Sequence, residues 1–157
     1  MKIQYQTIGI IHSPFDQTDG MPIQPSRAKG VKGSVEVNPE YVEALADLDG
    51  FSHIILLYHF HRARAHSLKV IPFLDDEPRG LFSTRAPSRP NPIGLSLVRL
   101  LKIDGGTLLI ANVDILEGTP VLDIKPYVSE FDESTEARFG WLEKARQRNR
   151  EADNRFE

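Results

Sequence analysis

Short segments that alternate between apolar and polar residues follow one another along this chain, with few helical stretches between them. Alternation with period two, rich in Val, Ile, Tyr and Phe, is typical of β-strands. The Asp104-Gly105-Gly106 sequence between two such segments predicts a hairpin turn. Because the strands do not alternate regularly with helices, we expect a mainly antiparallel β architecture, closed or nearly closed so that its edges are protected. The expected strands span residues 3–12, 33–37, 51–60, 98–103, 107–115 and 121–125.

Two helices accompany these strands. Asn38 and Pro39 have the residue types of an N-cap and a first helical position, and Gly50 is suited to end that short early helix. The segment that follows, residues 51–60, is almost continuously apolar, so we expect a strand buried on both faces. Near the end of the chain, residues 134–152 combine a modest apolar face with a basic second half, which predicts a C-terminal helix.

Length and composition indicate one domain, residues 1–157, with a β core over about residues 3–130. The chain has 157 residues, 40% of them hydrophobic and 26% charged, which is ordinary for a globular protein. The absence of cysteine excludes thiol catalysis, cysteine-ligated zinc, iron–sulfur clusters and disulfides. No signal peptide is recognisable, and the longest apolar run is too short to span a bilayer. We therefore expect a cytoplasmic protein without membrane contact.

The segment Phe82–Arg99 concentrates proline, arginine and hydrogen-bonding side chains. Three prolines make its first half stiff and extended, which lowers the entropy lost when a ligand is held. No acidic residue occurs from Pro78 to Ile103, although the net charge of the chain is -3. This asymmetry predicts a local anion-binding surface. The alternative is a proline-rich surface connection whose arginines are merely solvated.

Two further clusters have the residue types of a binding site. His53, His59 and His61 share one strand face and have the residue type of metal ligands. No carboxylate with ligand-like spacing accompanies them, so we expect no metal site and assign His61 to ligand contact at the rim. The turn of residues 114–120 brings two carboxylates to a strand end, and Asp123, Lys125 and Tyr127 follow on one strand face. Such groups suit a cation, a ribose hydroxyl or an amine, or else form a charged turn and a surface ion pair.

Four blocks of the sequence, residues 8–14, 49–61, 82–96 and 114–127, resemble the TsaA-like (TrmO, YaeB) family. The Arg-Pro-Asn-Pro-Ile-Gly sequence of residues 89–94 and the Gly-Thr-Pro sequence of residues 118–120 carry the resemblance most specifically. The resemblance implies a single-sheet antiparallel β-barrel, usually a homodimer, that uses S-adenosyl-L-methionine as its cofactor. It also implies methylation of N6 of threonylcarbamoyladenosine at position 37 of tRNA, next to the anticodon. The alternative is a non-catalytic regulatory module that binds S-adenosylmethionine or RNA.

The same resemblance assigns roles to individual residues. Arg85 is expected to pair with the cofactor's carboxylate, and Asp114 or Glu117 to hold its ribose hydroxyls or amino group. Arg89, Arg99 and the basic C-terminal helix are candidates for tRNA phosphates. The implied cofactor residues are Gln24, Pro25, Ser26, His61, Arg62, Arg85, Leu95, Asp114, Ile115, Leu116 and Glu117. The residues expected to position the modified base are Asn91, Asp123, Lys125 and Tyr127, the last for stacking or proton handling.

Overall fold

Six antiparallel strands close into a barrel in this computed structural model, which describes residues 1–18, 21 and 28–145. The strands follow one another around the barrel in the order β1-β2-β7-β6-β3-β8, and β8 pairs with β1 to close it. The predicted mainly β barrel is confirmed. The strands are β1 (Gly9–His12), β2 (Lys32–Val37), β3 (His53–His59), β6 (Ile93–Asp104), β7 (Thr107–Ala111) and β8 (Thr119–Pro126).

The apolar core fills the interior of the barrel. Along β3, Ile54, Leu56 and Tyr58 are buried, whereas the residues between them are only half-buried. The expectation that this strand is buried on both faces was wrong, because a single-layered barrel leaves the outer face of each strand without a second layer. Fully buried residues from the other strands complete the core: Ile11, Val35, Val98, Leu108, Ile110 and Val121.

β1 and β7 are only about half as long as the sequence predicted. β1 begins at Gly9 instead of Ile3, and the Thr7 hydroxyl donates to the carbonyls of Gly9 and Val121 at the point where the pairing starts. β7 ends at Ala111 because Asn112 has a φ of 66°, which takes the chain out of the extended conformation. The predicted hairpin between β6 and β7 is confirmed, with Gly105 at a φ of 58°.

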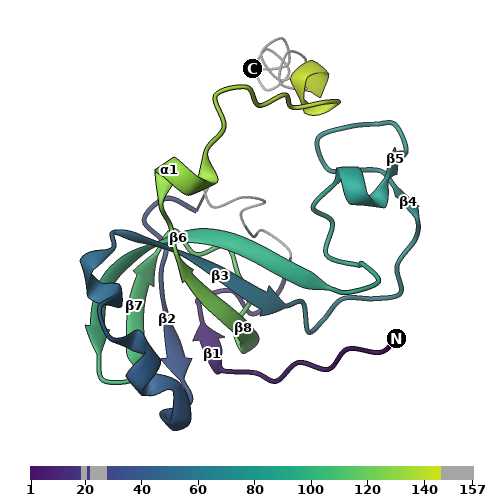
Figure 1. Cartoon of the computed structure of the whole chain (residues 1–157). Helices are drawn as coiled ribbons and strands as arrows, with labels where there is room; N and C mark the ends of the chain where they lie inside the picture. The colour runs from purple at the N-terminus through teal and green to yellow at the C-terminus, as the bar shows by residue number, and fades with distance from the viewer. Residues whose placement is uncertain (19–20, 22–27, 146–157) are drawn as a thin grey trace, which may run out of the picture.

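The early helix is two short 3₁₀ helices, η2 (Pro39–Leu45) and η3 (Leu48–Gly50). Asp47, with a φ of 67°, separates them. Asn38 stands at the N-cap position, but its side-chain amide donates to the carbonyl of Thr7 at 3.2 Å and makes no capping bond. These helices lie next to the barrel end at which β2 finishes and β3 begins (Figure 1).

The C-terminal helix expected over residues 134–152 begins later than predicted, because residues 134–141 are not helical. A short helix, α1 (Ser129–Asp132), precedes this range, residues 133–141 are not helical, and helical residues return only at 142–145. Gly140 has a φ of 54°, a conformation that interrupts a right-handed helix. Residues 146–152 of the predicted helix lie outside the described residues.

A small lobe stands beside the barrel, between β3 and β6 in the sequence (Figure 1). It contains the two-stranded sheet of β4 (Lys69–Val70) and β5 (Arg79–Gly80), followed by the 3₁₀ helix η4 (Leu81–Ser83). The C-terminal segment contacts this lobe, since the Trp141 indole donates to the carbonyl of Ser83 at 2.9 Å and the Arg79 guanidinium lies 5.7 Å from the Trp141 ring centre.

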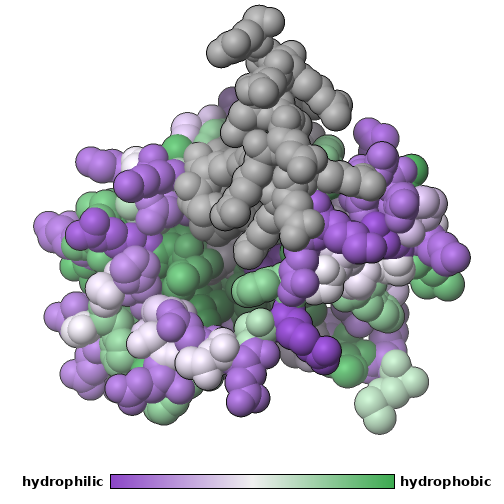
Figure 2. All heavy atoms as spheres, turned by 90° about the horizontal axis from the view of Figure 1, so that it is seen from above, coloured by the Kyte–Doolittle hydropathy of each residue, from purple (hydrophilic) through white to green (hydrophobic). Residues whose placement is uncertain are grey.

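The face seen from above the barrel is mostly hydrophilic, with hydrophobic residues gathered in one area near its middle (Figure 2). No helix in the described ranges is both long and apolar enough to cross a membrane.

Candidate functional site

The predicted cofactor residues lie on loops at one rim of the barrel. The antiparallel order places the ends of β1, β3 and β7 and the starts of β2, β6 and β8 at this rim, opposite the end that η2 and η3 adjoin. The loop after β3 carries His61 and Arg62, the loop before β6 carries Arg85 and Asn91, and the loop between β7 and β8 carries residues 114–117. Gln24, Pro25 and Ser26 lie outside the described residues.

Asp114 is held from inside the barrel by a chain of hydrogen bonds. The Ser96 hydroxyl donates to its Oδ1 at 2.7 Å, and the Tyr58 hydroxyl lies 3.0 Å from Ser96 Oγ. Ser96 and Tyr58 are only 1% and 5% exposed. Burial raises the pKa of Asp114, and the hydrogen bond from Ser96 opposes this shift. Burial likewise raises the pKa of Tyr58 to about 12, so its phenol stays protonated.

Gly94 gives the Tyr58 ring room to reach Ser96. Gly94 lies opposite Tyr58 in the β3–β6 ladder, and a Cβ at this position would come within 2.2 Å of the Tyr58 ring and 2.9 Å of the Phe60 ring. The two rings meet edge to face with centroids 5.3 Å apart. Arg85 also lies near Tyr58, because its charge lowers the pKa of the phenol. The rim therefore brings a cation and a carboxylate, Arg85 and Asp114, to the same tyrosine.

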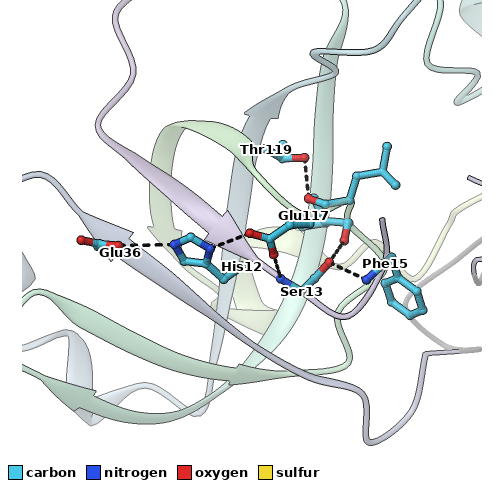
Figure 3. Close-up of polar contacts among 8 residues, drawn as sticks. His12, Ser13, Phe15, Glu36, Glu117 and Thr119 are labelled. Carbon is cyan, nitrogen blue, oxygen red and sulfur yellow. Dashed lines mark hydrogen bonds and ion pairs between the residues drawn. The ribbon is translucent and has the colours of Figure 1, made fainter. Parts of the chain in front are cut away.

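Glu117 fastens the first strand to the turn before β8 (Figure 3). Its two oxygens accept hydrogen bonds from His12 Nδ1 and from the backbone N–H of Ser13, both at 2.7 Å. These hydrogen bonds, with His12 contributing most, lower the pKa of Glu117. The Glu117 hydrogen bond is also the main reason that the pKa of His12 is raised, and Glu36 lies 3.3 Å from the other ring nitrogen. Of the two carboxylates at this turn, Glu117 is the one with both oxygens engaged in the fold.

The loop after β3 meets the same turn. The Thr119 hydroxyl donates to the Leu116 carbonyl at 2.7 Å and lies 3.3 Å from His61 Nδ1. Burial, followed by the charge of Arg62, lowers the pKa of His61, which favours the neutral ring. Arg62 itself donates to the carbonyl of Asp16 at 2.6 Å. The structure thus brings the predicted residues His61, Arg62, Leu116 and Glu117 into one network of loops.

The predicted residues of β8 lie on the outside of the barrel. Asp123 and Lys125 pair with Leu57 and Ile55 of β3, and the two charged side chains form an ion pair at 2.7 Å. The ladder register places Leu95 beside Leu57 on the same outer face, so Leu95 and Asp123 are two strands apart at one level. Tyr127 follows β8, where its ring meets His53 edge to face at 6.4 Å and its hydroxyl donates to Glu133 at 2.6 Å.

Asn91 is not brought together with these residues within one chain. It precedes Ile93, which pairs with His59, whereas Asp123 pairs with Leu57. An offset of about four residues along the strands and two strand spacings separates Asn91 from Asp123 by roughly 15 Å. Arg89, a predicted phosphate ligand, points one guanidinium nitrogen at the carbonyls of Leu81, Thr84 and Ala86, at 3.4, 2.9 and 3.3 Å, and so supports the loop that carries Arg85.

The histidines of β3 do not form a metal centre. Six residues of extended strand, about 20 Å, separate His53 from His59. His53 Nδ1 lies 2.8 Å from the Ser52 hydroxyl. Within the described ranges, no group of three histidine or carboxylate side chains is arranged to hold a metal ion.

Sequence reasoning did not identify Ser96, Tyr58, His12, Ser13 and Thr119 as members of this site. One signal was present in the sequence: Ser96 is a polar residue between Gly94 and Val98, on the inward-facing parity of a strand whose core positions are otherwise apolar or glycine. The contact of His12 with Glu117 joins residues 105 positions apart, and no local pattern contains it.

Comparison with known proteins gives one consistent result. Residues 10–133 match the family model described as the tRNA-methyltransferase O N-terminal domain. The chain is 58% identical over 144 residues to a probable S-adenosyl-L-methionine-binding protein from Pyrococcus abyssi, covering 92% of this chain and 78% of that protein. It is 39% identical to the Homo sapiens tRNA (adenine(37)-N6)-methyltransferase, covering 81% of this chain and 30% of the human protein.

A solved structure agrees with these sequence relatives. The crystal structure of TrmO from Pseudomonas aeruginosa superposes with a TM-score of 0.76 at 40% identity, over 90% of this chain and 63% of that one. The chain therefore spans less than two thirds of that protein's length. The family model, the relatives and the barrel agree, and the chain belongs to the TrmO (TsaA-like) family through its tRNA-methyltransferase O N-terminal domain.

Proposed function

We propose that this protein is an S-adenosylmethionine-dependent methyltransferase that methylates N6 of threonylcarbamoyladenosine at position 37 of tRNA. The observation that carries the proposal is that Arg85 and Asp114, on rim loops within the range that matches the family model, both act on the buried Tyr58. The name of the human relative supports adenine 37 of tRNA, and the name of the Pyrococcus abyssi relative supports the cofactor. The threonylcarbamoyl group of the substrate rests on the sequence resemblance.

The residues at the rim fit the chemistry of this cofactor. When bound, S-adenosylmethionine supplies an activated methyl group together with its own leaving group, so the chain needs no covalent nucleophile. Its task is to align the cofactor and the accepting nitrogen. Arg85 would bind the cofactor's carboxylate and Asp114 a donor group, with His61, Arg62 and residues 115–117 forming the surrounding loops. Leu95 would contact the cofactor from the outer face.

The outer face of β6, β3 and β8 is the proposed place for the tRNA and for a second copy of the chain. Ile93 and Leu95 are 40% and 52% exposed on β6, beside Leu57 of β3. A second copy seated on these side chains would remove them from water. On the same face, Asp123, Lys125 and Tyr127 are proposed to position the base, and Arg99 to meet a phosphate. Because Asn91 is remote from Asp123 in one chain, a homodimer provides a route by which both serve one substrate.

The experiment that tests the activity is transfer of label from radioactive S-adenosylmethionine to tRNA. The tRNA is taken from cells with and without the threonylcarbamoyl modification. The variant Lys125→Ala, which changes one of the residues proposed to position the base, is measured in parallel. We expect label only in the modified tRNA and at least tenfold less with the variant. Equal label in both tRNA pools would contradict the proposed substrate.

A non-catalytic module that binds S-adenosylmethionine is the second candidate. The name of the Pyrococcus abyssi relative, which states binding and no reaction, favours it. This candidate predicts saturable cofactor binding without label transfer to either tRNA pool, so the same experiment separates the two functions when binding is measured alongside.

A further inference from the structure

Two hydroxyl groups in the interior of the barrel form a chain of hydrogen bonds that ends at the proposed cofactor site. Tyr58 on β3 and Ser96 on the neighbouring strand β6 are both buried on the inner face of the barrel, with their hydroxyl oxygens 3.0 Å apart, and Ser96 Oγ donates to Asp114 Oδ1 at 2.7 Å. Hydroxyl groups on core strands are costly to bury unless they are hydrogen-bonded. In this chain both are buried, and each has a partner in the other.

The direction of the hydrogen bonds is fixed by the chemistry of the last group. An ionised carboxylate only accepts, so Ser96 donates to Asp114 and its remaining lone pairs accept from Tyr58. The phenol can donate because burial raises its pKa to about 12 and keeps its proton in place. The relay Tyr58–Ser96–Asp114 therefore delivers one strong donor to a single carboxylate oxygen and leaves further acceptor positions on that carboxylate for a ligand.

We infer that Ser96, held in turn by Tyr58, is the positioning residue that orients the Asp114 carboxylate toward the α-amino group of the cofactor's methionyl end. The inference rests on the proposed function and makes it more specific. Its second support is Arg85, whose charge acts on the same Tyr58 phenol as that of Asp114. An arginine and a carboxylate that both act on one tyrosine have the charges that complement the carboxylate and ammonium of an α-amino acid. The other rim loops then contact the ribose and adenine of the cofactor.

The relay also defines which groups influence the protonation of Asp114. Ser96 contacts it from β6 and Tyr58 lies behind Ser96 on β3, while the charge of Arg85 acts on Tyr58. Burial raises the pKa of Asp114, and the Ser96 hydroxyl opposes that shift. Without this hydroxyl the carboxylate is protonated at a higher pH, and it loses its attraction for an ammonium group there.

The test uses the full chain and two ligands that differ only at the methionyl end. S-adenosylhomocysteine carries the α-amino acid, whereas 5′-methylthioadenosine has the same adenosine and a thioether without it. Dissociation constants are measured by calorimetry for the wild type, Ser96→Ala and Tyr58→Phe. Ser34→Ala on β2 is the matched control, since Ser34 lies outside the relay. Thermal melts establish that each variant is folded.

We expect Ser96→Ala to weaken the binding of S-adenosylhomocysteine roughly tenfold, because a hydrogen bond to a charged group is lost. Tyr58→Phe weakens this binding by a smaller factor, because the same hydrogen bond is only weakened. Both variants bind 5′-methylthioadenosine within twofold of the wild type. The pH below which S-adenosylhomocysteine binding is lost is higher in Ser96→Ala than in the wild type, and it is unchanged in Ser34→Ala. A purely structural role for Ser96 would weaken both ligands alike.

The outcomes separate the inference from the function on which it rests. If the wild type binds neither ligand, the proposed cofactor site is wrong and the inference falls with it. If the wild type binds both ligands and Ser96→Ala weakens them equally, or leaves the pH limit unchanged, only the relay is overturned. If Ser96→Ala does not fold, Tyr58→Phe must still discriminate between the ligands, and equal affinity changes in that variant overturn the inference.

Discussion

At the scale of single residues, the pair of His12 and Glu117 makes the fastening of β1 dependent on pH. The pKa of His12 is raised, so its contribution to stability is complete below its ordinary value of 6.5 and is lost as the pH rises through the raised value. The pKa of Glu117 is lowered, so its contribution is complete above 4.5 and is lost as the pH falls through the lowered value. The pair therefore stabilises the fold most between pH 4.5 and 6.5.

Replacement of the histidine tests this window. We expect His12→Gln to lower the free energy of unfolding more at pH 6 than at pH 9, by less than about 1 kcal/mol because the pair is partly exposed. Urea denaturation at the two pH values measures the difference. Glu36→Gln, which changes the weaker partner at 3.3 Å, is the control and should show a smaller pH dependence. Equal losses at both pH values would contradict the role of the charged ring.

Asp114 is a residue whose ionisation opposes stability. Burial raises the pKa of its carboxyl, so ionisation at neutral pH destabilises the folded state, and this cost is absent below the ordinary pKa of 3.8, where the group is protonated in both states. Asp114→Asn should raise the melting temperature slightly at pH 8, where about 1 kcal/mol corresponds to roughly 2–4 °C in a chain of this length. It should also weaken S-adenosylhomocysteine binding at least tenfold. A lower melting temperature at pH 8 with unchanged affinity would show that the carboxylate serves the fold alone.

At the scale of elements, the contact between β3 and β6 depends on the glycine that faces Tyr58. A methyl group at Gly94 would lie 2.2 Å from a carbon of the Tyr58 ring, so the ring must move or the strands must separate. Gly94→Ala should lower the free energy of unfolding by about 1–3 kcal/mol, as overpacking of a core does. Gly80→Ala is the matched control, because a Cβ there meets no atom within 4 Å. Thermal or chemical denaturation compares the two variants, and equal stability would place the Tyr58 ring elsewhere.

The presence of most strands could be predicted from the sequence, whereas their first and last residues could not. The alternation along β6 and the apolar run along β3 are local properties of the sequence, and so is the Gly105–Gly106 turn. The end of β7 depends on the backbone conformation of Asn112, and the start of β1 depends on where β8 ends its pairing. The start of the C-terminal helix was misplaced because the segment is interrupted at Gly140 and its Trp141 contacts the lobe.

At the scale of the whole molecule, many of the predicted site residues follow strand ends that the barrel brings to one rim, but the sequence did not contain the hydrogen bonds that connect them. The resemblance pointed to Asp114 and Arg85, while the relay that holds Asp114 requires β3 and β6 to be paired in one register. The same register divides the predicted residues into a rim group and an outer-face group with Asp123, Lys125 and Tyr127. If the proposed roles hold for both groups, ligand contacts come from two surfaces of the barrel, which a second copy of the chain would join.

Assembly is therefore the property of the whole molecule to test. We expect a homodimer, with twice the 17.7 kDa mass of the chain, in which the outer face of β6 is covered. Ile93→Glu should shift the mass measured by light scattering after gel filtration toward the monomer, because a charge in an apolar interface is left without a partner. Leu109→Glu on β7 is a control of equal exposure, at 41% against 40% for Ile93, and should leave the dimer intact. If both variants remain dimeric, the second copy sits on another face, and if the wild type is monomeric, the residues of the outer face must serve the substrate of their own chain.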